Sequence, residues 1–131
     1  MRDVAANIHF ISLENNELKS ITSEFMTTFN QLQELNLAGN YLKQLPDAVK
    51  TLSHLTTINL ARNKFSVFPH ELTELTTLER INLEANEIIE IPVETLTSMP
   101  SFKSLNMKSN PLSREPLTDG QTKLKFELLT G

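Results

Sequence analysis

The sequence predicts an α/β fold: a right-handed solenoid of about five coils, with a parallel concave sheet on one side and short helices or irregular segments on the convex side. Three observations predict this architecture. The chain repeats itself at intervals of 23 or 24 residues, every copy follows one apolar template, and an asparagine recurs at a fixed place in each copy. Because one such unit cannot bury its apolar side chains alone, successive units must stack on a shared core.

The repeats start near residues 8, 32, 55, 78 and 102 of a 131-residue chain that we predict to be a single domain, 1–131. The second copy, LQELNLAGNYLKQLP, carries apolar side chains at its first, fourth, sixth, eleventh and fourteenth places. The fourth and sixth places flank a polar fifth, which is the period of a strand. Each copy therefore predicts a short strand, at residues 34–36 in the second copy, followed by a return along the convex side.

An asparagine stands at the ninth place of every copy, where the chain leaves the strand and turns inside the body. Backbone groups without partners are costly there, and a short amide side chain can both donate to and accept from the turn and the next coil. This argument favours a structural role over a polar binding ladder for five residues: Asn16, Asn40, Asn63, Asn86 and Asn110.

The template L-x-x-L-x-L-x-x-N-x-L-x-x-L-P, which extends from residue 8 to about residue 116, resembles the leucine-rich repeat family. The 23-residue copies with Pro46, Pro69 and Pro92 after the last core place are similar to its short intracellular type. The stretches 15–35 and 86–106 are also similar to one particular group within the family. The resemblance implies a protein-interaction module whose partners are usually held on the concave sheet.

We expect a cap at the C-terminal end of the repeat array and none at the N-terminal end. Seven residues precede Ile8, and we expect them to be too few to cover the apolar side chains of the first coil. With no N-terminal cap expected, a further segment or another molecule covers that end, and self-association through the first coil is possible. Residues 112–131 are predicted to be a C-terminal cap, in which residues 123–128 form a closing strand or short helix after a loop at residues 119–121.

Composition and motifs argue against catalysis. The chain has no cysteine, and its three histidines lie in different registers of the coil, where they cannot converge on a zinc ion. Three glycines leave no glycine-rich phosphate loop, and neither a nucleophile elbow nor an H-E-x-x-H motif occurs. The sequence therefore predicts a protein that is not an enzyme and that uses no cofactor, metal or small-molecule substrate.

The charge pattern argues against nucleic-acid and membrane partners. The net charge is −4, from 12 basic and 16 acidic residues without a basic block. No apolar run approaches the ~20 residues that span a bilayer, and the start lacks the apolar core of a signal peptide. We expect an intracellular adaptor or regulatory scaffold for an unidentified protein, in the cytoplasm or the nucleus. The alternative is a nucleic-acid or ribonucleoprotein-associated leucine-rich repeat protein.

The register of the repeat selects the side chains of the concave face, defined here as the solvent-facing side of the predicted sheet. The residues predicted to bind a partner there are Phe10, Glu34, Asn36, Asn59, Arg62, Arg80, Asn82, Glu84 and Lys108. The fifth-place asparagines either contact the partner or form an edge-to-edge amide ladder that keeps the sheet soluble. Arg62 and Arg80 can bind acidic groups in bidentate fashion, unless Arg80 pairs across the sheet with Glu34 or Glu84.

Overall fold

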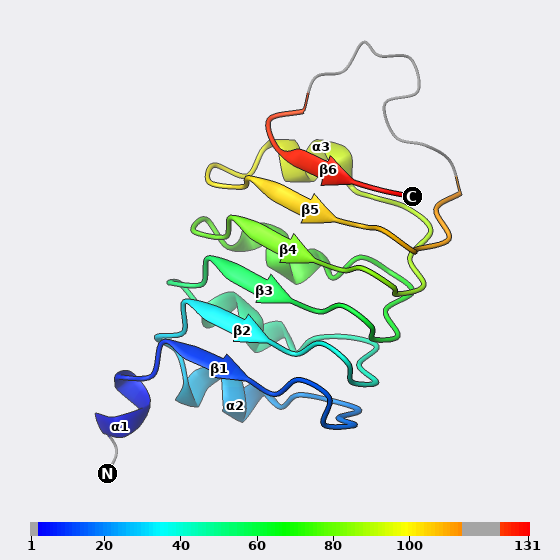
Figure 1. Cartoon of the computed structure of the whole chain (residues 1–131). Coiled ribbons are helices and arrows are strands. Elements are labelled where there is room, and N and C mark those ends of the chain that lie inside the picture. Colours follow the sequence, from blue (N-terminus) through cyan, green and yellow to red (C-terminus); the bar gives the residue numbers. More distant parts are fainter. Residues whose placement is uncertain (1–2, 114–123) are drawn as a thin grey trace.

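The computed structural model describes residues 3–113 and 124–131. In these residues six parallel strands form one sheet, and short helical segments cover one face of that sheet (Figure 1). The strands, in sheet order, are β1 (Phe10–Ser12), β2 (Glu34–Asn36), β3 (Thr57–Asn59), β4 (Arg80–Asn82), β5 (Ser104–Asn106) and β6 (Glu127–Leu129). The helical segments are α1 (Asp3–Ala6), α2 (Ser23–Thr28), η1 (Asp47–Thr51), η2 (His70–Glu74) and α3 (Val93–Thr97), where η denotes a 3-10 helix. The loop predicted at residues 119–121 lies outside the described residues.

Equivalent places of the repeat lie side by side across the sheet. The third places pair in register from strand to strand, in the order Phe10, Glu34, Thr57, Arg80, Ser104 and Glu127. The predicted fold class is therefore confirmed. The described chain adds a sixth strand, β6, to the repeats: it lies inside the predicted C-terminal cap and pairs in parallel with β5.

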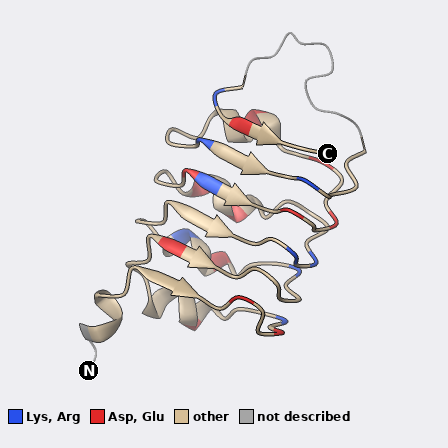
Figure 2. Cartoon of the chain, viewed as in Figure 1, with Lys and Arg blue, Asp and Glu red and all other residues tan. Residues whose placement is uncertain are grey.

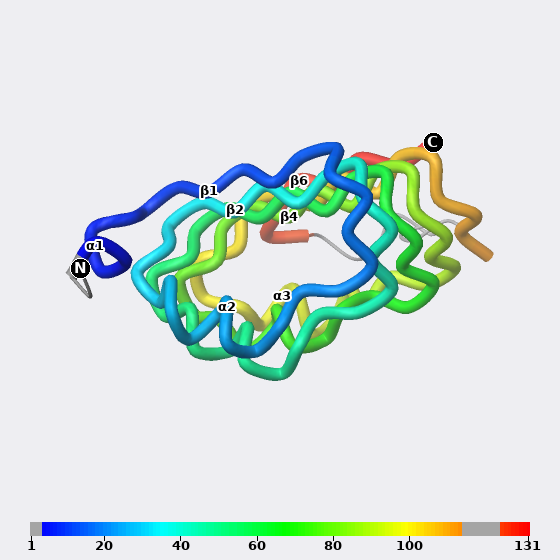
Figure 3. The backbone as a smooth tube through the Cα atoms, turned by 90° about the horizontal axis from the view of Figure 1, so that it is seen from below, coloured from blue at the N-terminus to red at the C-terminus, as the bar shows by residue number. Residues whose placement is uncertain are grey.

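The apolar places of the template point into the space between the sheet and the helical segments. In the second coil all five of them are at most 4% exposed: Leu32, Leu35, Leu37, Leu42 and Leu45. Figure 3 shows the strands on one side of this core and α2 and α3 on the other. Full burial of a leucine side chain is worth about 1.5–3 kcal/mol, so the stacked leucines supply the main driving force for folding.

Start signals in the sequence explain the short helices of the convex side. Pro46 and Pro69 stand directly before η1 and η2, with φ angles of −68° and −73°. The fixed φ of proline suits the start of a helical turn. Thr22 caps α2, because its hydroxyl oxygen accepts a hydrogen bond from the backbone N–H of Phe25 at 3.1 Å.

Lys50 links two neighbouring coils on the convex side. Its ammonium group lies 2.9 Å from the Asp47 carboxylate in its own segment and 3.1 Å from that of Glu74 in the next. Hydrogen bonds to Asp47 and Glu74 raise the pKa of Lys50 above its ordinary value. Because these groups meet water, the network contributes little to the free energy of unfolding.

The ninth-place asparagines lie in the turns that follow the strands. Three of them are buried, with at most 6% of the residue exposed: Asn40, Asn63 and Asn86. The amide nitrogen of Asn63 donates to the carbonyl oxygens of Leu60 in its own coil and Leu37 in the preceding coil. Its Oδ1 accepts from the backbone N–H of Leu42, also in the preceding coil, at 2.9 Å. One side chain therefore joins two coils and satisfies buried backbone groups of both.

The same inter-coil pattern recurs at Asn86 and Asn110, but the first asparagine departs from it. The Oδ1 atoms of Asn86 and Asn110 accept from the backbone N–H groups of Phe65 and Ile88, each in the preceding coil. Asn16 is exposed, and its amide nitrogen donates to the Glu14 oxygen of its own coil. The prediction that it lies inside the body is wrong, because no described coil packs in front of β1.

The two ends of the solenoid differ in how well their cores are covered. Apolar side chains of the first coil are only partly buried, among them Ile8, Ile11, Leu13, Leu18 and Phe29. Among the described strands, β1 pairs with β2 alone, and α1 lies beside the start of β1 (Figure 1). At the other end Phe126 is 6% exposed, and its ring centre lies 5.1 Å from that of Phe102. The last coil is therefore closed by an aromatic pair, whereas the first is open.

We expect Asn63→Ala to lower the free energy of unfolding by about 1–3 kcal/mol, because it leaves buried backbone groups of two coils without partners. Asn16→Ala is the matched control. It changes the same place of the repeat at an exposed position, so its loss should stay under about 0.5 kcal/mol. Urea unfolding followed by circular dichroism measures both, and equal losses would contradict a special role for the inter-coil hydrogen bonds.

We also predict that the chain self-associates through its first coil, where partly covered apolar side chains and an open strand edge lie together. Light scattering over a concentration series should report a mass that rises above the 14.8 kDa of the monomer. Because the contact is apolar, added salt should not reverse it. A constant monomer mass across the series is the result that would refute this prediction.

Candidate functional site

The concave face consists of the side chains that leave strands β1–β6 away from the core. Its third-place column runs from Phe10 to Glu127, and its fifth-place column holds Asn36, Asn59, Asn82 and Asn106. The fifth-place asparagines are half-buried, whereas Phe10, Glu34 and Arg80 in the other column are exposed. The backbone register of the sheet thus sets these groups in two parallel lines.

Glu14 links side chains of three coils at the edge of the concave face. Its carboxylate accepts a hydrogen bond from the amide of Asn36 at 3.3 Å and forms an ion pair with Arg62, Nη2 to Oε2, at 3.0 Å. Arg62 and Glu14 are separated by 48 residues along the chain. The arginine therefore reaches over the second coil to the first, so a predicted partner-binding group is engaged within the chain.

Arg80 is also paired within the chain, but not with the residues that the sequence suggested. Its Nη1 lies 3.1 Å from Oε1 of Glu79, and Lys103 approaches the same oxygen at 3.6 Å. The alternative that Arg80 pairs across the sheet with Glu34 or Glu84 does not hold, since its ion-pair partner is the neighbouring Glu79 at the second place of the repeat. Glu84 instead accepts a hydrogen bond from the amide of Asn106.

The fifth-place asparagines stabilise the turn after each strand. The Oδ1 of Asn59 accepts the backbone N–H of Ala61 at 3.0 Å. Asn36, Asn82 and Asn106 make the same bond to the residue two places on. The described structure contains no hydrogen bond from one of these amides to another. The edge-to-edge amide ladder is therefore a wrong prediction, because each side chain bonds its own turn.

These turns end in a left-handed residue at the eighth place of each coil. Arg62, Ala85 and Ser109 have φ angles of 56°, 60° and 61°. Gly39 occupies this place in the second coil with a φ of 71°, and a Cβ atom there would collide with the side chain of Asn15. Because L-residues with side chains adopt this conformation reluctantly, the hydrogen bond from the fifth-place asparagine helps to hold the turn.

Charges of both signs alternate over the concave face. Figure 2 shows acidic and basic positions interspersed along the strands and the adjoining turns. Among the described residues, neither Glu34 nor Lys108 has an ion-pair partner, and both are exposed. The sixth strand adds Glu127 beside Ser104. Within the described structure, the concave face thus has unpaired charges at Glu34 and Lys108, and between them two arginines that form ion pairs with acidic residues of the same chain.

The exposed aromatic group of the concave face lies at its first strand. Phe10 is 59% exposed, next to Glu34 in the register of the sheet. Tyr41, 47% exposed, lies after the strand β2, and its backbone N–H donates to Leu18. A phenylalanine that is more than half exposed within a strand is a candidate anchor for a partner.

The nine predicted partner-binding residues do not meet in one pocket. They lie along the sheet from Phe10 on β1 to Lys108 after β5. Glu14 and Glu79 form ion pairs with Arg62 and Arg80, and neither was among the partner-binding residues predicted from the sequence. Their repeat places gave no signal, since only side-chain reach decides which acid an arginine meets. In the part of the chain that the structure describes, no cluster of His, Asp and Glu could hold a metal ion.

The described helices are all too short, or too polar, to cross a membrane. The fold and the sheet surface instead define a repeat protein of the solenoid class. The model of the leucine rich repeat family matches residues 6–65 and 31–88 of the chain. This chain therefore belongs to the leucine-rich repeat family, as the resemblance in its sequence indicated.

Two curated relatives are similar over nearly the whole chain. Leucine-rich repeat-containing protein 20 of Mus musculus is 61% identical over 129 residues, which cover 98% of this chain and 70% of the mouse protein. The protein of the same name from Homo sapiens is 55% identical over the same shares. The similarity of this chain to that group within the family is thereby confirmed.

Solved structures of other repeat proteins share the fold. A leucine-rich repeat protein of Leptospira interrogans has a TM-score of 0.75 and 28% identity, over 98% of this chain and 38% of its own. Internalin C2 of Listeria monocytogenes has a TM-score of 0.72 and 19% identity, over 100% and 56%. A chain of the Drosophila melanogaster SNF/U2A′ complex has a TM-score of 0.65 and 24% identity, over 82% and 62%. This chain spans less than two thirds of each of the three, and the last two likenesses show the fold alone.

We predict that Asn59→Ala lowers the free energy of unfolding by about 0.5–1.5 kcal/mol, because the N–H of Ala61 loses its acceptor. Ser104→Ala is the control on the same face of the sheet. The Ser104 side chain makes no hydrogen bond in the described structure, and its removal should cost under about 0.5 kcal/mol. Denaturant unfolding compares the two variants. A loss at Asn59 no larger than that at Ser104 would show that the turn does not need this bond.

Proposed function

We propose that this protein is a non-catalytic interaction module, an intracellular adaptor or regulatory scaffold that binds a partner protein on its concave face. Membership of the leucine-rich repeat family supports this proposal, since the family typically consists of protein-interaction modules. The observation that carries it is the third-place column, in which Phe10, Glu34 and Arg80 stand exposed and in register on a sheet.

The preorganised backbone of the concave face favours binding. Parallel strands that pair in register hold their side chains at fixed positions, so a partner orders few groups when it binds. Arg80 has to exchange Glu79 for an acid of the partner, and an exposed ion pair of this kind is worth only about 0–1 kcal/mol. The exchange therefore costs little, and arginine is enriched among residues that dominate binding energies.

The mixed charges of the concave face favour a protein over a nucleic acid. Glu14 and Glu79 neutralise the two arginines of the sheet, and Glu34 is a free carboxylate. A phosphate backbone needs a continuous basic surface. A partner with alternating acidic and basic groups and one apolar contact for Phe10 would match this surface.

The test is binding of a purified partner to a charge-reversed concave face. We expect the double variant Arg62→Glu and Arg80→Glu to lose about 2 kcal/mol or more of binding free energy if these residues dominate the interface. Its melting temperature should barely move, because both arginine ion pairs are exposed. Affinity purification from cell extract identifies the partner, and calorimetry with the purified partner measures the change.

The matched control reverses two charges outside the strands. Lys19 and Lys43 are exposed and follow the turns of the first two coils, so Lys19→Glu with Lys43→Glu should leave partner binding unchanged. If the arginine variant melts normally and binds like the unchanged protein, the concave face is not the binding surface. If nuclease treatment removes the captured material and salt weakens its binding steeply, the nucleic-acid alternative is correct.

A further inference from the structure

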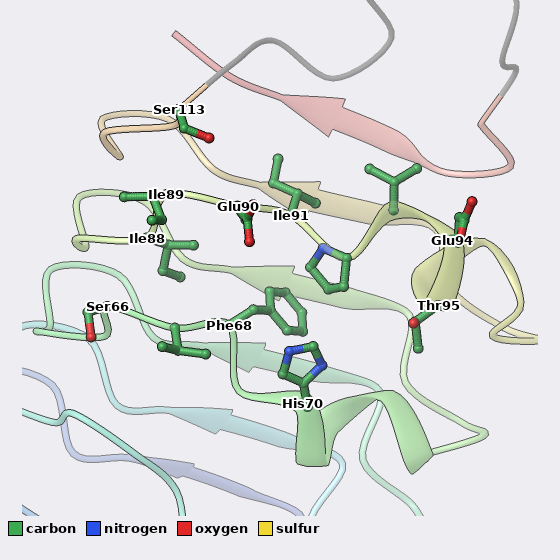
Figure 4. Close-up of a pocket in the computed structure, with 13 residues that line it drawn as sticks. Ser66, Phe68, His70, Ile88, Ile89, Glu90, Ile91, Glu94, Thr95 and Ser113 are labelled. Carbon is green, nitrogen blue, oxygen red and sulfur yellow. The ribbon is translucent and has the colours of Figure 1, made fainter.

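A hollow in the surface lies outside the strands, on the third and fourth coils, and Ser113 of the fifth coil also lines it. It encloses about 560 Å³ between the segment that follows β3, the segment that follows β4 and the start of α3 (Figure 4). Phe68 and Ile88 form its floor and are 3% and 1% exposed. The His70 ring contacts the Phe68 ring edge to face, with ring centres 5.8 Å apart. The hollow is thus a groove with a firm apolar base.

Two apolar side chains on the rim of this groove depart from the repeat. Val67 is 64% exposed and Ile89 is 52% exposed. At the place of Ile89 the other copies carry polar residues: Lys19, Lys43, Ser66 and Ser113. At the place of Val67 the first two coils carry Ser20 and Gln44. The repeat template does not require apolar residues at these two places, so Val67 and Ile89 are not needed for the turn or the core. Exposed apolar side chains gathered in a groove mark binding surfaces.

The charges at the groove are all negative. Glu90 and Glu94 line it, and its lining includes no lysine or arginine among the described residues. Neither carboxylate has an ion-pair partner in the described part of the chain, and both are exposed. In Figure 4 Glu90 lies on the segment that follows β4, and Glu94 lies on α3. A cationic group at this place would gain two partners without breaking an existing ion pair.

We propose that this groove binds a short segment of a partner protein in which one or two large apolar side chains are flanked by lysine or arginine. The apolar base would take the side chains, and Glu90 and Glu94 would pair with the basic residues. The same acidic rim disfavours a second copy of this chain, which would bring like charges together, and an anionic membrane surface. The proposal concerns a different surface from the concave face and does not depend on it.

The experiment is an NMR titration of the isotope-labelled full chain with a short synthetic peptide that carries two leucines between pairs of lysines. Two control peptides replace either the lysines by glutamate or the leucines by serine. We expect the backbone amide signals of residues 66–68, 88–91 and 93–95 to move with the first peptide and to stay in place with both controls. The signals of strand residues on the concave face should not move.

Variants of the groove make the test specific. Val67→Gln with Ile89→Ser introduces residue types that other coils carry at these places, and Glu90→Lys with Glu94→Lys reverses the rim. Each pair should weaken peptide binding by at least about tenfold. Glu24→Lys changes the place equivalent to Glu94 in the first coil, and Arg80→Glu changes the concave face, so both should bind like the unchanged protein.

Several results would overturn the proposal. One is a peptide response outside the groove, and another is equal binding of the glutamate peptide. Unchanged affinity of the Val67 and Ile89 variant, measured on a chain whose spectrum is otherwise that of the folded protein, is a third. If that variant instead abolishes the concentration-dependent rise in mass seen by light scattering, the groove is a contact between copies of the chain and the proposed occupant is wrong.

Discussion

The hydrogen bonds of the ninth-place asparagines are the constraint on which the rest of the structure depends. Each coil must turn sharply inside the body after its strand, and the amide of Asn63 satisfies backbone groups of two coils at that turn. Because the turn is fixed, the strand before it keeps its leucines inward and its third and fifth places outward. The core, the sheet register and the concave face all follow from this one polar contact in an apolar interior.

The repeat in the sequence was sufficient to predict the sheet. The period places Leu35, Ile58 and Ile81 on neighbouring strands, and they are paired and buried as the template requires. The period also fixes which residues share the concave face, because backbone register alone determines that list. The sixth strand does not follow the template, and it was the alternation of apolar and charged residues at 123–128 that predicted a closing strand or short helix there; the structure has a strand at Glu127–Leu129. The period could not foresee the exposure of Asn16, which depends on what lies in front of the first coil.

Side-chain contacts on the concave face could not be predicted, because they depend on reach rather than on register. Arg62 bypasses its own neighbours to meet Glu14 two coils away, and Arg80 turns to the adjacent Glu79. The sequence has more than one acidic residue on the coils near each arginine, and a pattern of residue types does not rank them. The groove at Val67 and Ile89 carried a signal of a different kind: apolar residues at places where the other copies are polar.

The register of the sheet also spaces the side chains of the concave face at regular intervals. Equivalent groups on successive strands are separated by the strand spacing of about 4.8 Å, and Phe10, Glu34, Thr57 and Arg80 are successive marks on that scale. The hydrogen bonds of the ninth-place asparagines join each coil to the one before it. Gain or loss of a whole repeat would therefore change the number of strands on the concave face by one and leave the spacing between strands unchanged. Partners of such a protein can therefore be matched by the number of coils as well as by the residues on them.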